Sequence, residues 1–105
     1  MTLNLHDWTL LDVRVDWALG TVEIHALDPA SSVRRLVFES LVDVLIDRRE
    51  PWGSSNSINE VTWNHDGEAL SVKIELQSGG GVRITAGSCN LDGAECIFRH
   101  GIPGI

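Results

Sequence analysis

The feature that most constrains this chain is a strict alternation of apolar and polar residues across two glycine-containing turns. Between 59 and 87, apolar residues recur at every second position on both sides of Asp66-Gly67, and again on both sides of Ser78-Gly79-Gly80. A two-residue period is typical of a β-strand with one buried and one solvated face. Asp-Gly pairs and glycine-containing triplets are typical hairpin loops. The segment therefore predicts a three-stranded antiparallel meander.

The two expected loops also fix a register for each hairpin. A two-residue turn at Asp66-Gly67 and a three-residue loop over 78–80 both bring apolar residues together on one face and opposite charges together on the other. Agreement between turn chemistry and side-chain pattern supports the meander. The expected cross-strand pairs are Trp63 with Leu70, Glu60 with Lys73, Leu76 with Val82 and Glu75 with Arg83.

The same period extends into the first third of the chain. Leu11, Val13, Val15 and Trp17 alternate with charged residues and are expected to form one buried face. Pairing Trp17 with Val22 across the following turn would keep both apolar faces together. Two more strands are predicted over 35–39 and 41–47, after a loop at 28–32.

Length and composition then decide the fold class. With 105 residues, 43% of them hydrophobic, the chain can bury one core and is too short for two. Short strands separated by single Gly and Pro residues are typical of all-β proteins. We therefore predict that 1–105 form a single all-β domain, an antiparallel β-sandwich or partly open barrel of about seven to nine strands.

Charge and hydropathy exclude several classes of protein. The apolar stretch around 41–46 is interrupted by Asp within a few residues, so no membrane span is expected. Residues 1–7 lack the basic start and apolar core of a signal peptide, which predicts a cytoplasmic protein. A net charge of -7 argues against nucleic-acid binding, which needs a basic patch.

The two cysteines are placed by a second Asp-Gly pair. A two-residue turn at Asp92-Gly93 brings Cys89 directly opposite Cys96. A disulfide would fit sterically, but a cytoplasmic setting and a hydrogen-bonded position both disfavour it. We therefore expect two reduced, mostly buried thiols.

The loop 50–57 is the main candidate for a binding surface. It places Trp52 among small hydrogen-bonding residues, namely Ser54, Ser55 and Asn56. Binding residues concentrate on loops held by a rigid scaffold, and exposed tryptophans often anchor a partner. The alternative is that Trp52 folds back and plugs the open end of the sandwich.

A second candidate surface precedes the first expected strand, at His6, Asp7 and Trp8. By position, Trp8 and Trp52 are the tryptophans expected at the surface. The alternating pattern places Trp17 and Trp63 in the core instead.

Catalytic and metal-binding motifs are not found. The histidines and cysteines lack the spacing of a zinc site, and no nucleophile motif or phosphate-binding loop is present. We therefore predict no metal, no cofactor and a non-enzymatic module that binds a protein partner through the 50–57 loop and an acidic face. The alternative is a small-ligand or metal-dependent enzyme with a pocket at the barrel mouth, built from distant His and Asp residues. Self-association into a homodimer through open edge strands is a third interpretation.

Five segments of the chain carry a further signal, namely His6-Asp7, Asp16-Trp17, 49–55, 76–79 and 86–89. Together they resemble a group of small bacterial proteins with no established activity. The likeness runs from His6 to about Leu91, and this chain has Gly80 where such proteins usually have an acidic residue. The resemblance implies a compact bacterial domain and supplies no mechanism; by analogy alone it suggests an immunity or accessory protein.

Overall fold

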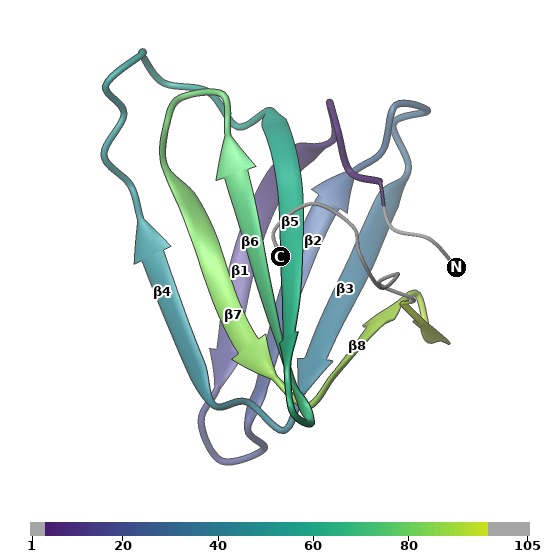
Figure 1. Ribbon diagram of the computed structural model, residues 1–105. Coiled ribbons are helices and arrows are strands. Elements are labelled where there is room, and N and C mark those ends of the chain that lie inside the picture. The colour runs from purple at the N-terminus through teal and green to yellow at the C-terminus, as the bar shows by residue number, and fades with distance from the viewer. Residues whose placement is uncertain (1–3, 97–105) are drawn as a thin grey trace.

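The computed structural model describes residues 4–96, which form nine β-strands and no helix. The strands pack as two antiparallel sheets, with the orders β1-β2-β3-β8-β9 and β4-β7-β6-β5 (Figure 1). The predicted all-β fold is thereby confirmed, in the form of a sandwich. No helix among these residues is long and apolar enough to cross a membrane. The strands are β1 (Thr9–Asp16), β2 (Thr21–Leu27), β3 (Val33–Glu39), β4 (Asp43–Asp47), β5 (Ile58–Asp66), β6 (Ala69–Leu76), β7 (Gly81–Ala86), β8 (Ser88–Leu91) and β9 (Ala94–Glu95).

The core lies between the two sheets and is built by the two-residue period. In β2, β6 and β7 every second residue is buried and its neighbours are more exposed, as alternation predicts. Burial of these aliphatic side chains is the main stabilising contribution, because apolar area removed from water gives roughly 25 cal/mol per Å². The fully buried aliphatic and aromatic side chains are Leu5, Val22, Ile24, Leu36, Phe38, Ile58, Val72, Ile74 and Ile84.

The central meander forms, but both of its predicted registers are wrong by two residues. The first turn is at Gly67-Glu68, so Trp63 pairs with Val72 and Lys73 with Thr62. The second loop spans 77–79, with Gly79 in the left-handed region at φ 99°. Shifting the pairing of two strands by two residues leaves every residue on its predicted face. It abolishes both expected charge pairs, because Glu60 lies opposite Glu75 and Lys73 lies opposite Arg83.

The first hairpin corrects the prediction for Trp17. Asp16 pairs with Thr21, and the turn comprises residues 17–20, closed by Gly20 at φ 65°. The Asp16 carboxylate accepts a hydrogen bond from the Leu19 N–H at 2.9 Å, which fixes this turn one residue earlier than expected. Trp17 is therefore 92% exposed instead of buried. Leu11 and Val15, also expected inside, are exposed on this edge strand.

The last hairpin has the predicted register. Asp92 and Gly93 both have positive φ, 50° and 87°, as a type I′ turn requires. The Cys96 N–H donates to the Cys89 carbonyl at 2.9 Å, so the two cysteines face each other at a hydrogen-bonded position. Both are free and buried, with their sulfur atoms 3.4 Å apart.

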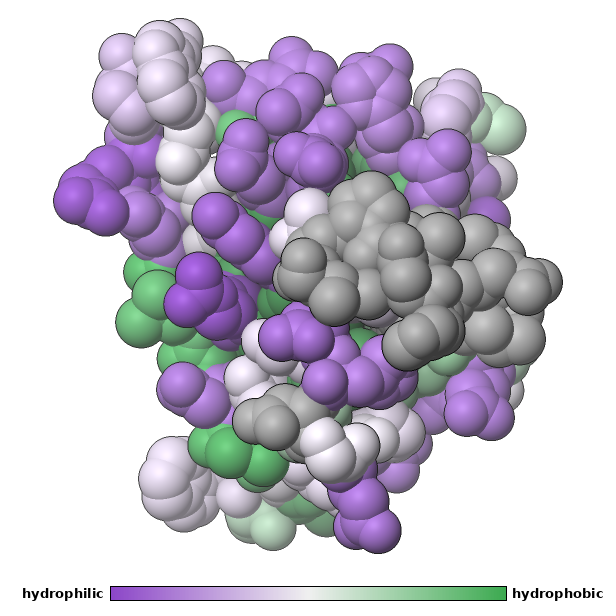
Figure 2. All heavy atoms as spheres, viewed as in Figure 1, coloured by the Kyte–Doolittle hydropathy of each residue, from purple (hydrophilic) through white to green (hydrophobic). Residues whose placement is uncertain are grey.

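One exposed feature of the sandwich is its edge strand β4. Leu45 and Ile46 of β4, and Val42 just before it, are large apolar residues that remain exposed. Figure 2 shows apolar atoms gathered on the flank of the molecule where β4 lies. An exposed apolar edge can pair with another strand, so proteins commonly cover it or protect it with charge.

An arginine joins the β8–β9 turn to the rest of the first sheet. Arg34 of β3 donates to the carboxylates of Asp28 and Asp92, and its guanidinium lies 5.4 Å from the centre of the Trp8 ring. Asp92 also accepts the Arg35 N–H at 2.9 Å. The Arg34 side chain lowers the pKa of Asp92, and the Ser32 N–H followed by Arg34 lowers that of Asp28.

This arrangement predicts a loss of stability in acid. A carboxylate whose pKa is lower in the folded than in the unfolded chain stabilises the fold above the unfolded value, here 3.8, and loses that effect as pH falls through the folded value. Urea unfolding at pH 6, 5, 4 and 3 should show the free energy of unfolding falling mainly below pH 5. The double variant Asp28→Asn/Asp92→Asn should be less stable than wild type at pH 6, and its free energy of unfolding should depend less on pH. An unchanged slope in the double variant would contradict this assignment.

Candidate functional site

The end of the sandwich that carries the β6–β7 loop gathers most of the residues singled out in the sequence. Loop 48–57 follows β4 and crosses this end toward β5 (Figure 1). The Trp52 N–H donates to the Ser78 carbonyl at 3.2 Å, and a Cβ added at Gly79 would overlap the Trp52 ring. The ring therefore lies against the β6–β7 loop and does not enter the core. Trp52 is 77% exposed, which rules out the interpretation that it plugs the sandwich.

His6 and Asp7 lie beside the same loop. The Gln77 amide donates to the Asp7 carboxylate at 3.4 Å, and the His6 Nδ1 is 2.6 Å from the Asn59 carbonyl oxygen. The Asp7 N–H also donates to the Ile58 carbonyl at 2.9 Å. Both side chains are exposed. The structure thus places His6 and Asp7 at the same end of the fold as Trp52, although they are far apart in sequence.

Trp8 was expected at the surface, and that expectation is wrong. Its exposed fraction is 9%, and it packs with the core cluster beneath Arg34. The Ile58 N–H donates to the Trp8 carbonyl at 2.8 Å, which draws this segment onto the beginning of β5. The prediction was based on the position of Trp8 at the start of a strand. It is wrong because segment 5–8 packs against the core through Leu5 and Trp8.

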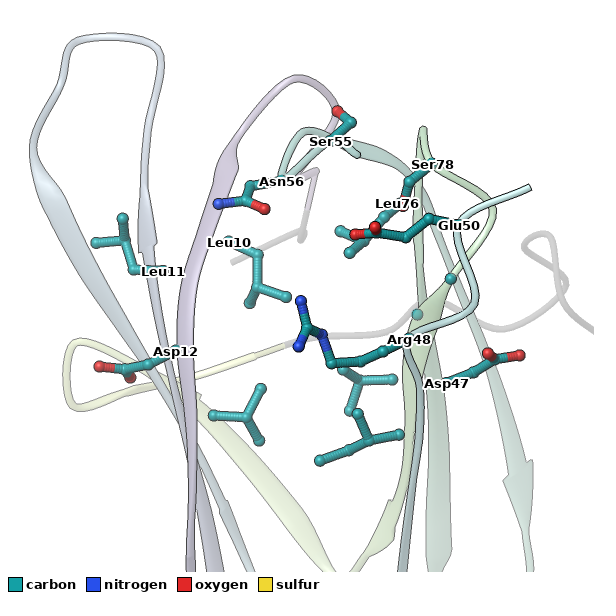
Figure 3. Close-up of a pocket in the computed structure, with 15 residues that line it drawn as sticks. Leu10, Leu11, Asp12, Asp47, Arg48, Glu50, Ser55, Asn56, Leu76 and Ser78 are labelled. Carbon is teal, nitrogen blue, oxygen red and sulfur yellow. The ribbon is translucent and has the colours of Figure 1, made fainter. Parts of the chain in front are cut away.

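A cavity of about 320 Å³ opens next to this end, between edge strand β1 and the end of β4 (Figure 3). Its apolar lining comes from the inner faces of both sheets, including Leu10, Val13, Leu76 and Val82. Ser55 and Asn56 of the predicted loop also line it, whereas Trp52 and Ser54 do not. The cavity exists because β1 and β4 are both edge strands, so this side of the sandwich is not closed by pairing.

Three polar side chains that line this cavity, those of Arg48, Glu50 and Ser78, have no partner among the described residues. Within residues 4–96, the side chains of Arg48 and Glu50 make no ion pair or hydrogen bond, and both line the cavity. Ser78 lines it too; this residue is 1% exposed, and its hydroxyl has no hydrogen-bond partner in the described part of the chain. A buried polar group left unpaired costs about 1 to 3 kcal/mol, so proteins rarely retain one without a reason.

The neighbours of Arg48 are paired with each other. Arg49 donates to the Asp47 carboxylate, with Nη2 to Oδ2 at 2.7 Å, and lowers the Asp47 pKa to about 2. In Figure 3 Asp47 points away from the space that Arg48 and Glu50 face. This pairing leaves the Arg48 charge available.

Two other clusters offer little chemistry. His25 bridges Asp12 and Glu23, with its ring nitrogens 2.7 and 3.0 Å from their carboxylates. Among the described residues, however, no three or more His, Cys, Asp or Glu side chains are arranged so that they could hold a metal ion. The hydrogen bond with Cys96 and burial together raise the pKa of the Cys89 thiol. Because only a thiolate is a strong nucleophile, Cys89 is poorly suited to nucleophilic catalysis.

Comparison with known proteins supports the fold. No protein-family model matches the chain, and no curated protein does. A crystal structure of an uncharacterized protein from Neisseria gonorrhoeae is similar, with a TM-score of 0.65 and 13% sequence identity over 83% of this chain and 91% of that one. At this identity the likeness shows that the two chains share a fold, and it assigns no activity.

Proposed function

We propose that this protein is a small bacterial, cytoplasmic binding module that holds a protein partner at the sandwich end formed by Trp52, Gln77, His6 and Asp7. The observation that carries the proposal is Trp52 itself, exposed over most of its surface yet anchored through its N–H and its contact with Gly79. A preorganised, exposed tryptophan loses little conformational freedom on binding and is a frequent binding hot spot.

The charge of the chain favours a basic partner. A net charge of -7 would speed the approach of a positively charged protein. The edge strand β4 adds selectivity, because its apolar centre is flanked by Asp43 and Asp47. If two copies paired through β4 about Leu45, Asp43 of one copy would face Asp47 of the other at both ends, which is destabilising. A foreign strand with basic residues avoids that repulsion, as in an immunity or accessory protein that binds a toxin or enzyme.

Two exposed tryptophans allow a matched test. Trp52 belongs to loop 48–57 and Trp17 to the β1–β2 turn, and these two segments lie at opposite ends of the sandwich (Figure 1). Trp17→Ala therefore controls for the loss of a surface aromatic. Tagged wild type and both variants would be used to capture proteins from lysate of the source organism. The dominant captured protein would then be purified and titrated by calorimetry. We expect Trp52→Ala to weaken binding at least 30-fold, the effect of a hot spot of about 2 kcal/mol, and Trp17→Ala to leave it unchanged.

Thermal unfolding of both variants shows whether either substitution disturbs the fold. Equal affinity of Trp52→Ala and wild type would contradict the proposal. Light scattering tests the alternative occupant, since a dimer that dissociates on Trp52→Ala would identify a second copy as the partner.

A further inference from the structure

We propose that the cavity between β1 and β4 binds a small apolar zwitterion, namely an α-amino acid with a long apolar side chain. In this arrangement Arg48 receives the carboxylate, Glu50 receives the ammonium group, and the side chain lies on the apolar floor. This site is separate from the surface around Trp52, which does not line the cavity, so either proposal can fail without the other.

The Arg48 side chain supports this proposal, because it has no carboxylate partner among the described residues. Of the other described arginines, Arg14, Arg34, Arg35 and Arg49 each have a carboxylate partner, whereas Arg83, which does not line this cavity, has none. Arg48 has none, although Asp47 precedes it directly, because Asp47 is bound by Arg49 through three contacts of 2.7 to 3.3 Å. The guanidinium of Arg48 extends toward the side where Leu10 and Asn56 lie (Figure 3). A planar guanidinium is well suited to bind a carboxylate through two parallel hydrogen bonds.

The opposite charge is supplied by Glu50. Glu50 also lines the cavity, and its carboxylate extends into the same space (Figure 3). It does not pair with Arg48, nor with any other residue between 4 and 96. Among the described residues, this cavity is lined by one unpaired cation and one unpaired anion, which is complementary to a ligand with both charges. The Asn56 amide, also part of the lining and without a side-chain partner in the described chain, can donate to the ligand carboxylate.

The apolar lining of the cavity and its volume also fit a small ligand. Leu10, Val13, Leu76 and Val82 present an apolar surface to the cavity. A volume of about 320 Å³ is at the lower end of the range typical of small-molecule sites, roughly 300 to 1,000 Å³. The lining therefore combines a mostly apolar surface with a few polar groups, as ligand sites do.

The hydroxyl of Ser78 is a further polar group of this cavity to which a ligand can hydrogen bond. This buried hydroxyl lacks a partner within residues 4–96, and the residue belongs to the lining of the cavity. A bound carboxylate would then satisfy it. Replacing Ser78 by alanine should accordingly leave the free protein equally stable or more stable and weaken binding of the ligand.

The test uses three compounds with the same tail and different charges: 2-aminooctanoate, octanoate and octylamine. Each is titrated into the full chain and followed by calorimetry and by backbone amide shifts of Gly80 and Gly81, which line the cavity. We expect 2-aminooctanoate to bind wild type at least tenfold more tightly than either singly charged compound.

Arg48→Gln and Glu50→Gln separate the two charges. Arg48→Gln should weaken 2-aminooctanoate and octanoate about tenfold and leave octylamine unaffected, whereas Glu50→Gln should weaken 2-aminooctanoate and octylamine and leave octanoate unaffected. Arg83→Gln, which removes an exposed arginine of β7 that does not line the cavity, should bind like wild type. Equal binding of the three compounds, absence of binding at 10 mM, or identical profiles for the Arg48 and Glu50 variants would overturn the proposal.

Discussion

Truncating Phe38 to alanine is expected to lower the free energy of unfolding by about 3 to 5 kcal/mol. Phe38 is 0% exposed and lies in β3, directly between Val22 of β2 and Cys89 of β8. Strands flank it on both sides and the second sheet covers it, so the surrounding structure cannot collapse into the space left by the ring. Domains of this size are stabilised by about 5 to 15 kcal/mol, so the loss is a large share of the total. Urea unfolding followed by tryptophan fluorescence measures it.

The neighbouring residue in β3 provides the control. Val37 lies on the outer face, in register with Glu23 and Asn90, and is only partly buried. Its replacement by alanine should cost about 1 kcal/mol or less. Phe38→Leu should also remain within about 1.5 kcal/mol of wild type, because it preserves most of the apolar volume. A smaller loss for Phe38→Ala than for Val37→Ala would contradict the assignment of the two faces of β3.

In the central meander the faces of the strands were predictable because they depend on the period alone. Trp63, Val72 and Val82 lie inside in the observed register, as they did in the expected one. A hairpin register changes in steps of two when its loop moves by one residue, and such a step preserves the inner and outer sets. Cross-strand partners were not predictable to the same degree, since they depend on which residues form the turn.

The two Asp-Gly turns illustrate that limit. At 92–93 the Asp-Gly dipeptide itself forms the two-residue turn. At 66–67 only the glycine belongs to the turn, which comprises Gly67 and Glu68. Asp92 is held in the left-handed region by contacts with β3, where it accepts the Arg35 N–H and donates its own N–H to the Arg35 carbonyl at 2.8 Å. Those contacts come from a strand more than 50 residues earlier, and local turn chemistry carries no information about them.

The tryptophans were half predicted. Trp63 is buried, as expected, and Trp52, for which both an exposed and a plugging position were open, is exposed. Trp8 and Trp17 exchange their expected roles. Alternation placed Trp17 inside, but the turn closed by Gly20 begins at that residue and removes it from the strand. Trp8 is enclosed by Arg34 and β5, which are distant in sequence. Periodicity thus fails at strand ends, where turn geometry and long-range packing decide burial.

The candidate site was predicted only in part. Trp52, Ser55 and Asn56 belong to a loop whose composition marked it for binding. The cavity residues Arg48 and Ser78 carried no such signal, because a single arginine between charged neighbours and a serine in a hairpin are ordinary features. Their significance comes from the open side of the sandwich between β1 and β4, which is a property of the strand order.

Substituting Gly80 with alanine should lower the free energy of unfolding by about 3 kcal/mol, at the upper end of the usual cost of overpacking. A Cβ at this position would lie 2.5 Å from the Asp47 carbonyl oxygen and 3.0 Å from that of Arg49. Both are backbone atoms, so relief requires the end of β4 and the start of loop 48–57 to move. A larger side chain at this position would therefore separate that loop from the β6–β7 loop.

Gly67→Ala is the matched control, because it tests backbone conformation without crowding. Gly67 has φ 62° and nothing within 4 Å of an added Cβ, so the substitution should cost only the left-handed strain of about 1 to 2 kcal/mol. Backbone amide shifts distinguish the two causes. Gly80→Ala should move the signals of Asp47, Arg48 and Arg49, whereas Gly67→Ala should leave them in place. If Gly80→Ala left those three signals unchanged, or destabilised the chain less than Gly67→Ala, β4 and loop 48–57 could not rest against Gly80, and the wall that positions Arg48 would lie elsewhere.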